Sequence, residues 1–187
     1  MKKRLFIAID PPDDFKDAIE KELERIRYEF TNDVRFLDRE NWHITITFLG
    51  DQDDAALIPI LESLREACAD FSSQSLNFSK MEYGPRGDSA RMIWLVGTPE
   101  TSKNLAALKT SLENALADRG VIFKREFRSF AVHITLARFL AAPASQLPDI
   151  TKKIDFSFIA ARASLMESRL QRSGSHYQLL QQENFTL

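Results

Sequence analysis

The spacing of apolar residues along the chain predicts three amphipathic helices. In each segment the apolar side chains recur every three or four residues, so they share one face of a helix. Asp10 and Thr98 each precede a proline, and we interpret them as N-terminal caps of the first and third helices. The three apolar faces consist of Phe15, Ile19, Leu23, Ile26 and Phe30, then Leu57, Ile60, Leu61, Leu64 and Cys68, then Leu105, Leu108, Leu112 and Leu116.

Short apolar or alternating runs predict β-strands between and after these helices. The runs cover residues 5–9, 34–37, 42–49, 75–81, 92–96, 131–139, 156–159, 163–170 and 176–180. Turn-forming residues predict a loop at 83–88 and a hairpin turn at 172–175.

The order of these elements repeats. Each copy contains a strand, a proline-started helix, a short strand and a strand that begins at a histidine. Pro11 to His43 spans 43 − 11 = 32 residues, and Pro99 to His133 spans 133 − 99 = 34. The repeat predicts an α+β fold of two pseudo-symmetric, βαβ-like lobes, with antiparallel sheets facing a central cleft and helices on the outside. Because no linker interrupts the pattern, residues 1–187 are expected to form a single domain.

Charge and composition narrow the possible functions. The chain has 25 Lys and Arg against 27 Asp and Glu, a net charge of -2, whereas proteins that hold long nucleic acids are usually clearly basic. Any contact with nucleic acid is therefore expected to be local. The apolar run at residues 5–9 is too short for a secretory signal, and the single cysteine excludes an internal disulfide. We expect a cytoplasmic monomer that does not contact a membrane.

Two segments with the same pattern carry the candidate chemistry: His43-Ile44-Thr45-Ile46-Thr47 and His133-Ile134-Thr135-Leu136-Ala137. Alternate side chains of a strand share a face, so in each copy a histidine and a threonine two residues later point the same way. Strict alternation also predicts that Thr47 joins the first set, that Phe48 points into the core and that Arg138 points away from His133.

This set of side chains suits phosphodiester hydrolysis without a metal. A neutral imidazole of one of the pair His43 and His133 can take a proton from water, and the other, as imidazolium, can protonate the leaving oxygen. The hydroxyls of Thr45 and Thr135 can hydrogen-bond the phosphate oxygens.

Each of these residue types also has a more ordinary interpretation. A single His-x-Thr in a strand is usually structural, but the chain has three histidines and two begin the repeated motif. His176 is expected to be an exposed or edge residue, and Cys68 a core residue rather than a nucleophile. Neither motif has further ligands at zinc spacing, so no metal and no cofactor are expected. Trp42 and Trp94 are expected in the core rather than at a base-stacking site.

With these motifs the chain resembles the two-histidine phosphoesterase superfamily, and within it the RNA 2′,3′-cyclic phosphodiesterases, also called the 2′-5′ RNA ligase family. The likeness covers nearly the whole chain. It rests on residues 4–9, 41–50, 91–95, 133–138 and 167–170, with Gly174 and Tyr177.

The resemblance implies hydrolysis of a terminal 2′,3′-cyclic phosphate to a 2′-phosphomonoester, with weak reverse 2′-5′ ligation. It implies that His43 is the proton donor and His133 the acceptor, and that Thr45 and Thr135 hold the phosphate. The chain departs from the family pattern at Thr47, where arginine is frequent, and at Val132, where proline is frequent.

Two alternatives remain open at the level of the sequence. One keeps the site but changes the substrate from RNA ends to a small cyclic nucleotide or an ADP-ribose cyclic phosphate. The other is a non-catalytic protein that binds RNA ends or nucleotides.

Overall fold

The computed structural model describes residues 2–30, 34–85, 87, 89–143, 147–150, 153–171 and 174–187. The three predicted apolar faces correspond to helices α1 (Asp13–Arg27), α2 (Leu57–Ala69) and α3 (Pro99–Asp118). Two single 3₁₀ turns, Arg39–Asn41 and Asp54–Ala56, precede β3 and α2. The strands are β1 (Lys3–Ile9), β2 (Arg35–Phe36), β3 (Ile44–Gln52), β4 (Gln74–Gly84), β5 (Ala90–Gly97), β6 (His133–Ala142), β7 (Lys153–Ala160), β8 (Arg162–Gln171) and β9 (Gly174–Asn184).

Of the two predicted helix caps, one is confirmed and one is wrong. The Thr98 side chain accepts a hydrogen bond from the Thr101 amide, as expected of a cap before α3. Helix α1 instead begins after Pro12, because a proline disfavours helical geometry in the residue before it, here Pro11. Asp10 is free of the helix, and its carboxylate accepts a hydrogen bond of 3.0 Å from the Ser164 hydroxyl on β8.

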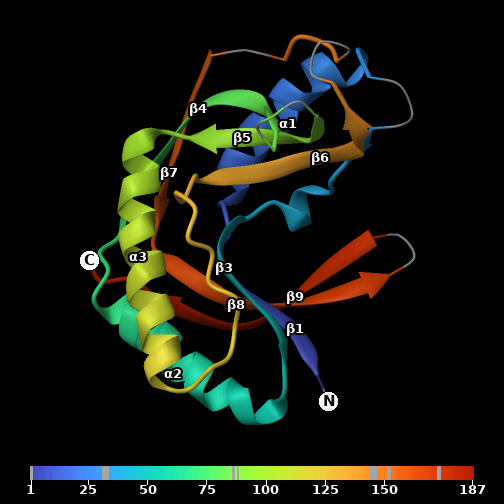
Figure 1. Ribbon diagram of the computed structural model, residues 1–187. Helices are drawn as coiled ribbons and strands as arrows, with labels where there is room; N and C mark the ends of the chain where they lie inside the picture. Colours follow the sequence, from blue (N-terminus) through green and yellow to red (C-terminus); the bar gives the residue numbers. More distant parts are fainter. Residues whose placement is uncertain are drawn as a thin grey trace.

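The described strands form one antiparallel sheet in the order β7-β4-β5-β6-β3-β1-β8-β9, with β2 paired to β6. The two strands that carry the repeated motif, β3 and β6, are neighbours but pair only at Ile44 and Ile134. Beyond this pair β3 leaves β6, and β2 takes its place beside Ala137 and Arg138. The sheet is therefore divided into two halves that diverge from a narrow junction, one formed by β7, β4, β5 and β6 with the short β2, the other by β3, β1, β8 and β9 (Figure 1).

The helices cover the outer faces of the two halves, as the repeat predicted (Figure 1). Phe15 of α1 packs against Phe78 of β4 and Phe158 of β7. Helices α2 and α3 pack against each other, α2 on β8 and β9 and α3 on β3 and β4. Helix α1 follows β1 in the chain yet covers the half built from β4 to β7. The fold class is confirmed, and the two halves are interleaved rather than consecutive.

The second copy of the repeat lacks one expected element. In the first copy the short strand β2 precedes the histidine strand, as predicted. In the second copy residues 121–132, which join α3 to β6, contain no strand. We call these residues the α3–β6 segment.

Both motif strands contain a β-bulge at the same position. In the pairing of β1 with β3, Ala8 lies opposite Thr45 and Ile7 opposite Thr47, so Ile46 is an extra residue. In the pairing of β5 with β6, Leu136 is extra in the same way. A bulge shifts the alternation by one residue, so side chains beyond it change faces. In each strand two consecutive side chains are consequently buried, Ile46 with Thr47 and Leu136 with Ala137.

The bulge overturns two predictions that rested on strict alternation. Thr47 is 3% exposed and points toward α3, where its hydroxyl donates a 2.8 Å hydrogen bond to the Glu113 carboxylate. The same carboxylate is paired with Lys109 one turn earlier. Phe48, expected in the core, is 58% exposed on the opposite face of the sheet.

We predict that Thr47→Val lowers the free energy of unfolding by about 1–3 kcal/mol, because it removes a hydrogen bond from a buried carboxylate without changing the side-chain shape. Urea denaturation measures this value. Thr110→Val, on the exposed side of α3, is the matched control and should change it by less than about 0.5 kcal/mol. Equal effects of the two substitutions would contradict a specific contribution of the Thr47–Glu113 bond.

Candidate functional site

A cleft of about 660 Å³ lies between the two halves of the sheet, and the four predicted site residues line it. His43 and Thr45 come from β3 and its preceding residue, and His133 and Thr135 come from β6. The junction pair, Ile44 and Ile134, is fully buried on the other face. Because this pair is antiparallel, His43 lies on the side of Thr135 and Thr45 on the side of His133. The structure thus brings together residues 90 positions apart (133 − 43).

Each histidine is held by the same hydrogen bond. His43 Nδ1 lies 2.8 Å from the carbonyl oxygen of Asn41, and His133 Nδ1 lies 2.9 Å from that of Ala131. A carbonyl oxygen only accepts, so Nδ1 carries the hydrogen in both rings. The neutral form then has its lone pair on Nε2, and the charged form has its second proton there. In both rings Nε2 is the nitrogen available to a ligand.

Aromatic side chains pack against both imidazoles. The ring of His43 lies 5.0 Å from Phe6 and 5.0 Å from Tyr177, measured between centroids, and His133 is stacked at 4.2 Å on Trp94. The prediction that Trp94 belongs to the core is therefore wrong, because its indole is part of the cleft wall. The same prediction is confirmed for Trp42, which is fully buried.

A glycine on the neighbouring strand makes room for this tryptophan. A Cβ atom on Gly84 would lie 2.3 Å from the indole ring of Trp94, far too close for two nonbonded carbon atoms. The close approach of β4 to the indole thus depends on the missing side chain. No sequence signal linked this glycine to the histidine 49 residues later (133 − 84).

Burial lowers the pKa of both catalytic candidates below the usual value of about 6.5. For each ring the hydrogen bond to the backbone carbonyl acts in the opposite direction and favours the charged form. Asp10 also favours the charged form of His43, whereas His133 and Arg138 disfavour it. The net effect in both rings is that burial prevails and favours the neutral imidazole.

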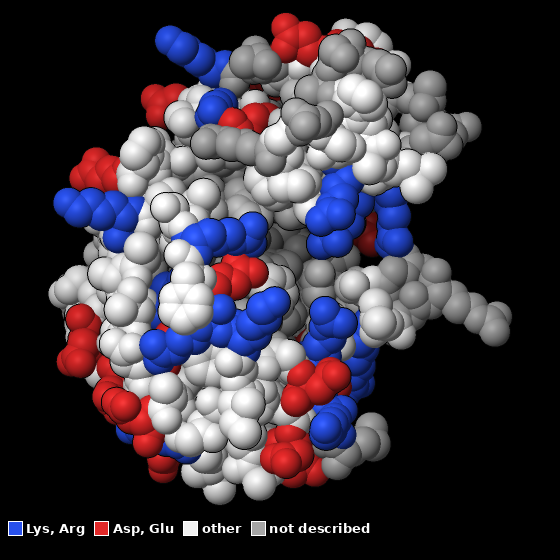
Figure 2. Space-filling model, in the orientation of Figure 1, with Lys and Arg blue, Asp and Glu red and all other residues white. Residues whose placement is uncertain are grey.

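The cleft is locally basic although the whole chain is slightly acidic. Figure 2 shows lysine and arginine side chains gathered around a hollow between the two halves of the molecule. The residues that line the cleft include two acids, Glu82 and Glu126, and five cations: Arg91, Lys109, Lys124, Arg128 and Arg138. A local excess of positive charge raises the affinity for an anionic ligand.

Arg138 is a site residue that alternation assigned to the wrong face. The bulge at Leu136 turns it into the cleft, five residues after His133. The equivalent position in the first motif, five residues after His43, is Phe48, whose ring lies 6.0 Å from Phe6. A cation and an aromatic ring thus occupy matching places in the two halves of the cleft.

The two departures from the family pattern have structural explanations. The side chain at position 47 points to α3, so a threonine there removes no cation from the surroundings of His43. The amide of Val132 donates a 3.1 Å hydrogen bond to the Ser102 hydroxyl of α3, a bond that proline could not form. Val132 thereby fixes the start of β6 to the helix.

The remaining predictions concern residues outside the cleft. Cys68 is 1% exposed, and burial raises its thiol pKa to about 12, so it is a core residue as predicted. His176 is exposed on the edge strand β9, also as predicted. The predicted turn at 172–175 lies partly outside the described residues.

In the described part of the chain, no three His, Cys, Asp or Glu side chains cluster as ligands for a metal ion. No described helix is long and apolar enough to cross a membrane.

Comparisons with known proteins agree on one family. Residues 9–94 and 96–177 match the model of the LigT-like phosphoesterases. An RNA 2′,3′-cyclic phosphodiesterase of Methanocaldococcus jannaschii is 29% identical over 96% of this chain and 99% of its own. One from Thermotoga maritima is 29% identical over 97% and 95%. The structure of E. coli LigT complexed with 3′-AMP has the same fold, with a TM-score of 0.81, 23% identity and complete coverage of both chains.

We predict that the NMR titrations of His43 and His133 have midpoints below 6.5, because burial disfavours both imidazolium ions. His43→Ala and His133→Ala assign the signals. The unfolded chain then binds more protons than the folded one just below pH 6.5, so stability falls as the pH falls through this window. A midpoint at or above 6.5 for either ring would contradict the desolvated environment.

Proposed function

The chain belongs to the LigT-like phosphoesterase family, and on this basis we propose that it hydrolyses the terminal 2′,3′-cyclic phosphate of RNA to a 2′-phosphomonoester. The observation that carries the proposal is the pair of histidines in one basic cleft, each with Nδ1 bound to a backbone carbonyl. The curated relatives at 29% identity are RNA 2′,3′-cyclic phosphodiesterases and are matched over nearly their whole length, which supports the same reaction here.

The two histidines divide the proton transfers between them. His133, neutral, accepts at Nε2 the proton of a water molecule that attacks the phosphorus atom. His43, protonated, donates the proton on Nε2 to the 3′-oxygen as the bond between this oxygen and phosphorus breaks. The products are a 2′-phosphomonoester and a free 3′-hydroxyl, and the two histidines have exchanged protonation states. Each proton transfer contributes roughly 10²- to 10⁴-fold to the rate.

The negative charge of the phosphoryl group is stabilised by three further side chains in the proposal. Thr45 and Thr135 donate hydrogen bonds from their hydroxyls to the non-bridging oxygens. Arg138, brought into the cleft by the bulge of β6, supplies a guanidinium on the same face. This arrangement needs no metal ion for charge neutralisation.

The proposal extends to weak 2′-5′ ligation if the 5′-hydroxyl of a second RNA takes the place of the attacking water. His133 then accepts the proton of this hydroxyl as the 5′-oxygen bonds to phosphorus, and His43 again protonates the 3′-oxygen as its bond to phosphorus breaks. We infer also that residues 1–187 act as a single domain and as a monomer. The single sheet that both halves share, and the packing of α1 on the half that does not contain β1, support the single domain.

We predict that His43→Ala and His133→Ala each reduce kcat on an oligoribonucleotide 2′,3′-cyclic phosphate by about 10²- to 10⁴-fold. Thr45→Val and Thr135→Val should cost about ten- to a hundredfold, the value of a hydrogen bond to a charged group. Thr45→Ser and Thr135→Ser, which keep the hydroxyl, are the matched controls and should retain most of the activity. Activity in EDTA should equal that without it.

Two results would refute this mechanism: activity that survives both histidine substitutions, and activity abolished by EDTA and restored by a divalent metal. Absence of turnover on every cyclic phosphate, together with binding of RNA ends, would favour the non-catalytic alternative. Circular dichroism of each variant shows whether lost activity reflects lost folding.

The pH dependence follows from the same pair. Because one histidine must be neutral and the other charged, we predict a bell-shaped profile of kcat/KM. Both pKa values lie below 6.5 in the free protein, so the maximum is expected below pH 6.5. Initial rates at substrate concentrations far below KM, in buffers of constant ionic strength, measure the profile. A rate that rises steadily through neutral pH would argue against paired acid–base catalysis.

A further inference from the structure

The α3–β6 segment forms one wall of the cleft and carries an unusual sequence. Residues 123–130 read Phe-Lys-Arg-Glu-Phe-Arg-Ser-Phe, in which three cations lie between three aromatic residues. Aromatic rings that stack on bases, combined with cations that bind phosphates, are typical of surfaces that bind single-stranded nucleic acid. The mechanism above uses none of these residues.

The three phenylalanines differ in their surroundings. Arg125 lies over the ring of Phe123 at 5.8 Å, and the Lys109 ammonium lies 6.0 Å from the ring of Phe130. Both of these rings are half-buried. Phe127 is 95% exposed, so its whole ring is available to a ligand.

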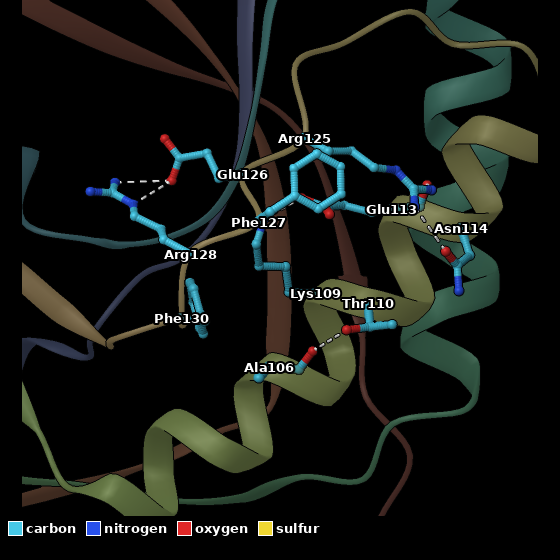
Figure 3. Close-up of a pocket in the computed structure, with 10 residues that line it drawn as sticks. All are labelled: Ala106, Lys109, Thr110, Glu113, Asn114, Arg125, Glu126, Phe127, Arg128 and Phe130. Atoms are coloured by element: carbon cyan, nitrogen blue, oxygen red, sulfur yellow. Dashed lines mark hydrogen bonds and ion pairs between the residues drawn. The ribbon is translucent and has the colours of Figure 1, made fainter.

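The cations also divide into two groups. Arg125 reaches back to α3, where it donates to the side chain of Asn114 and to the backbone of Glu113, and it therefore anchors the segment (Figure 3). Arg128 extends away from this helix, paired at 2.9 Å with Glu126 in an exposed ion pair of the kind that contributes little to stability (Figure 3). Lys124 forms no hydrogen bond or ion pair with any residue that the structure describes.

A second hollow lies beside the cleft, on the other side of this wall. It has a volume of about 280 Å³ and lies between α3 and the α3–β6 segment (Figure 3). Four residues line both spaces, Lys109, Glu126, Arg128 and Phe130, and Phe127 lines the second one. The segment is thus a cationic wall between two neighbouring spaces, and the exposed ring of Phe127 lies on the side of the second one.

We propose that the α3–β6 segment is a binding site for the nucleotide that precedes the cyclic end, with Phe127 stacking on its base and Lys124 and Arg128 binding the connecting phosphodiester. This inference rests on the proposed function and specifies its substrate class. A cyclic phosphate closes the 3′ end of RNA, so the strand continues only on the 5′ side and must leave the cleft across one wall. The wall formed by this segment has the groups to bind it. The substrate is therefore an RNA oligonucleotide rather than a mononucleotide.

The test compares a nucleoside 2′,3′-cyclic monophosphate with a trinucleotide that ends in the same cyclic nucleotide. The measured quantity is the ratio of kcat/KM for the trinucleotide to kcat/KM for the mononucleotide. We expect this ratio to exceed about ten in the wild type and to fall about 5- to 100-fold in Phe127→Ala, the effect of removing one base stack. The double variant Lys124→Ala/Arg128→Ala should lower this ratio too. In a plot of the logarithm of the ratio against the logarithm of the salt concentration, its slope should be shallower by about 0.7 for each phosphate that is no longer bound.

Controls on the same surface separate this role from general effects of exposed side chains. Ile122 is 88% exposed on the same segment and lines neither space, and Lys103 is exposed on α3. Ile122→Ala and Lys103→Ala should leave the ratio unchanged. A trinucleotide without the middle base is a control on the substrate side, because Phe127→Ala should then have no effect while Lys124→Ala/Arg128→Ala keeps its effect.

The outcomes distinguish the two proposals. If the wild type hydrolyses both substrates with a ratio near one, or if the variants leave the ratio unchanged, the nucleotide site is refuted while the proposed reaction stands. If the mononucleotide is the preferred substrate, the nucleotide site is refuted as well, and the alternative of a small cyclic nucleotide as substrate replaces the RNA end. If neither substrate is hydrolysed, the proposed function fails and the inference fails with it.

Discussion

One backbone contact, the antiparallel pair between Ile44 and Ile134, determines the arrangement of the candidate site. Both side chains are buried, and the residues before and after them carry the imidazoles and hydroxyls that line the cleft. A longer ladder between β3 and β6 would have continued the sheet without a break and left no cleft. A missing pair would have left the two histidines on separate surfaces. Pairing at a single residue both joins the halves and lets them diverge.

The matching bulges add the second constraint. By shifting the alternation after the threonine, they bury Thr47 and Ala137 and turn the next side chains, Phe48 and Arg138, toward the cleft. Backbone symmetry therefore produces chemical asymmetry, because one half presents a ring and the other a cation. The bulge of β3 is fixed from behind by the bond between Thr47 and Glu113, which connects α3 to the floor of the site.

The sequence predicted the helices, most of the strands along the chain and the meeting of the two histidines in one cleft, because these depend on periodicity and on a repeated motif. It failed where the result depends on contacts between distant segments. Nothing in the local pattern indicates the extra residue at Ile46 or Leu136, so the sheet faces predicted for Phe48 and Arg138 were wrong. Trp94 looked like a core residue because the space above Gly84 is created only when β4 and β5 pair. The repeat predicted a short strand before His133, so the irregular α3–β6 segment that forms one wall of the cleft was not predicted.

The position of β1 has a consequence for the synthesis of the protein. This strand lies between β3 and β8. One of its edges can pair with residues 44–52 early in synthesis, whereas the other can pair only with residues 164–167, which are synthesised much later. Until residues 164–167 have been synthesised, the Leu5–Ala8 edge has exposed amide and carbonyl groups that a second chain could pair with. The hairpin of β8 and β9 covers this edge, so its docking protects the nascent sheet from such association.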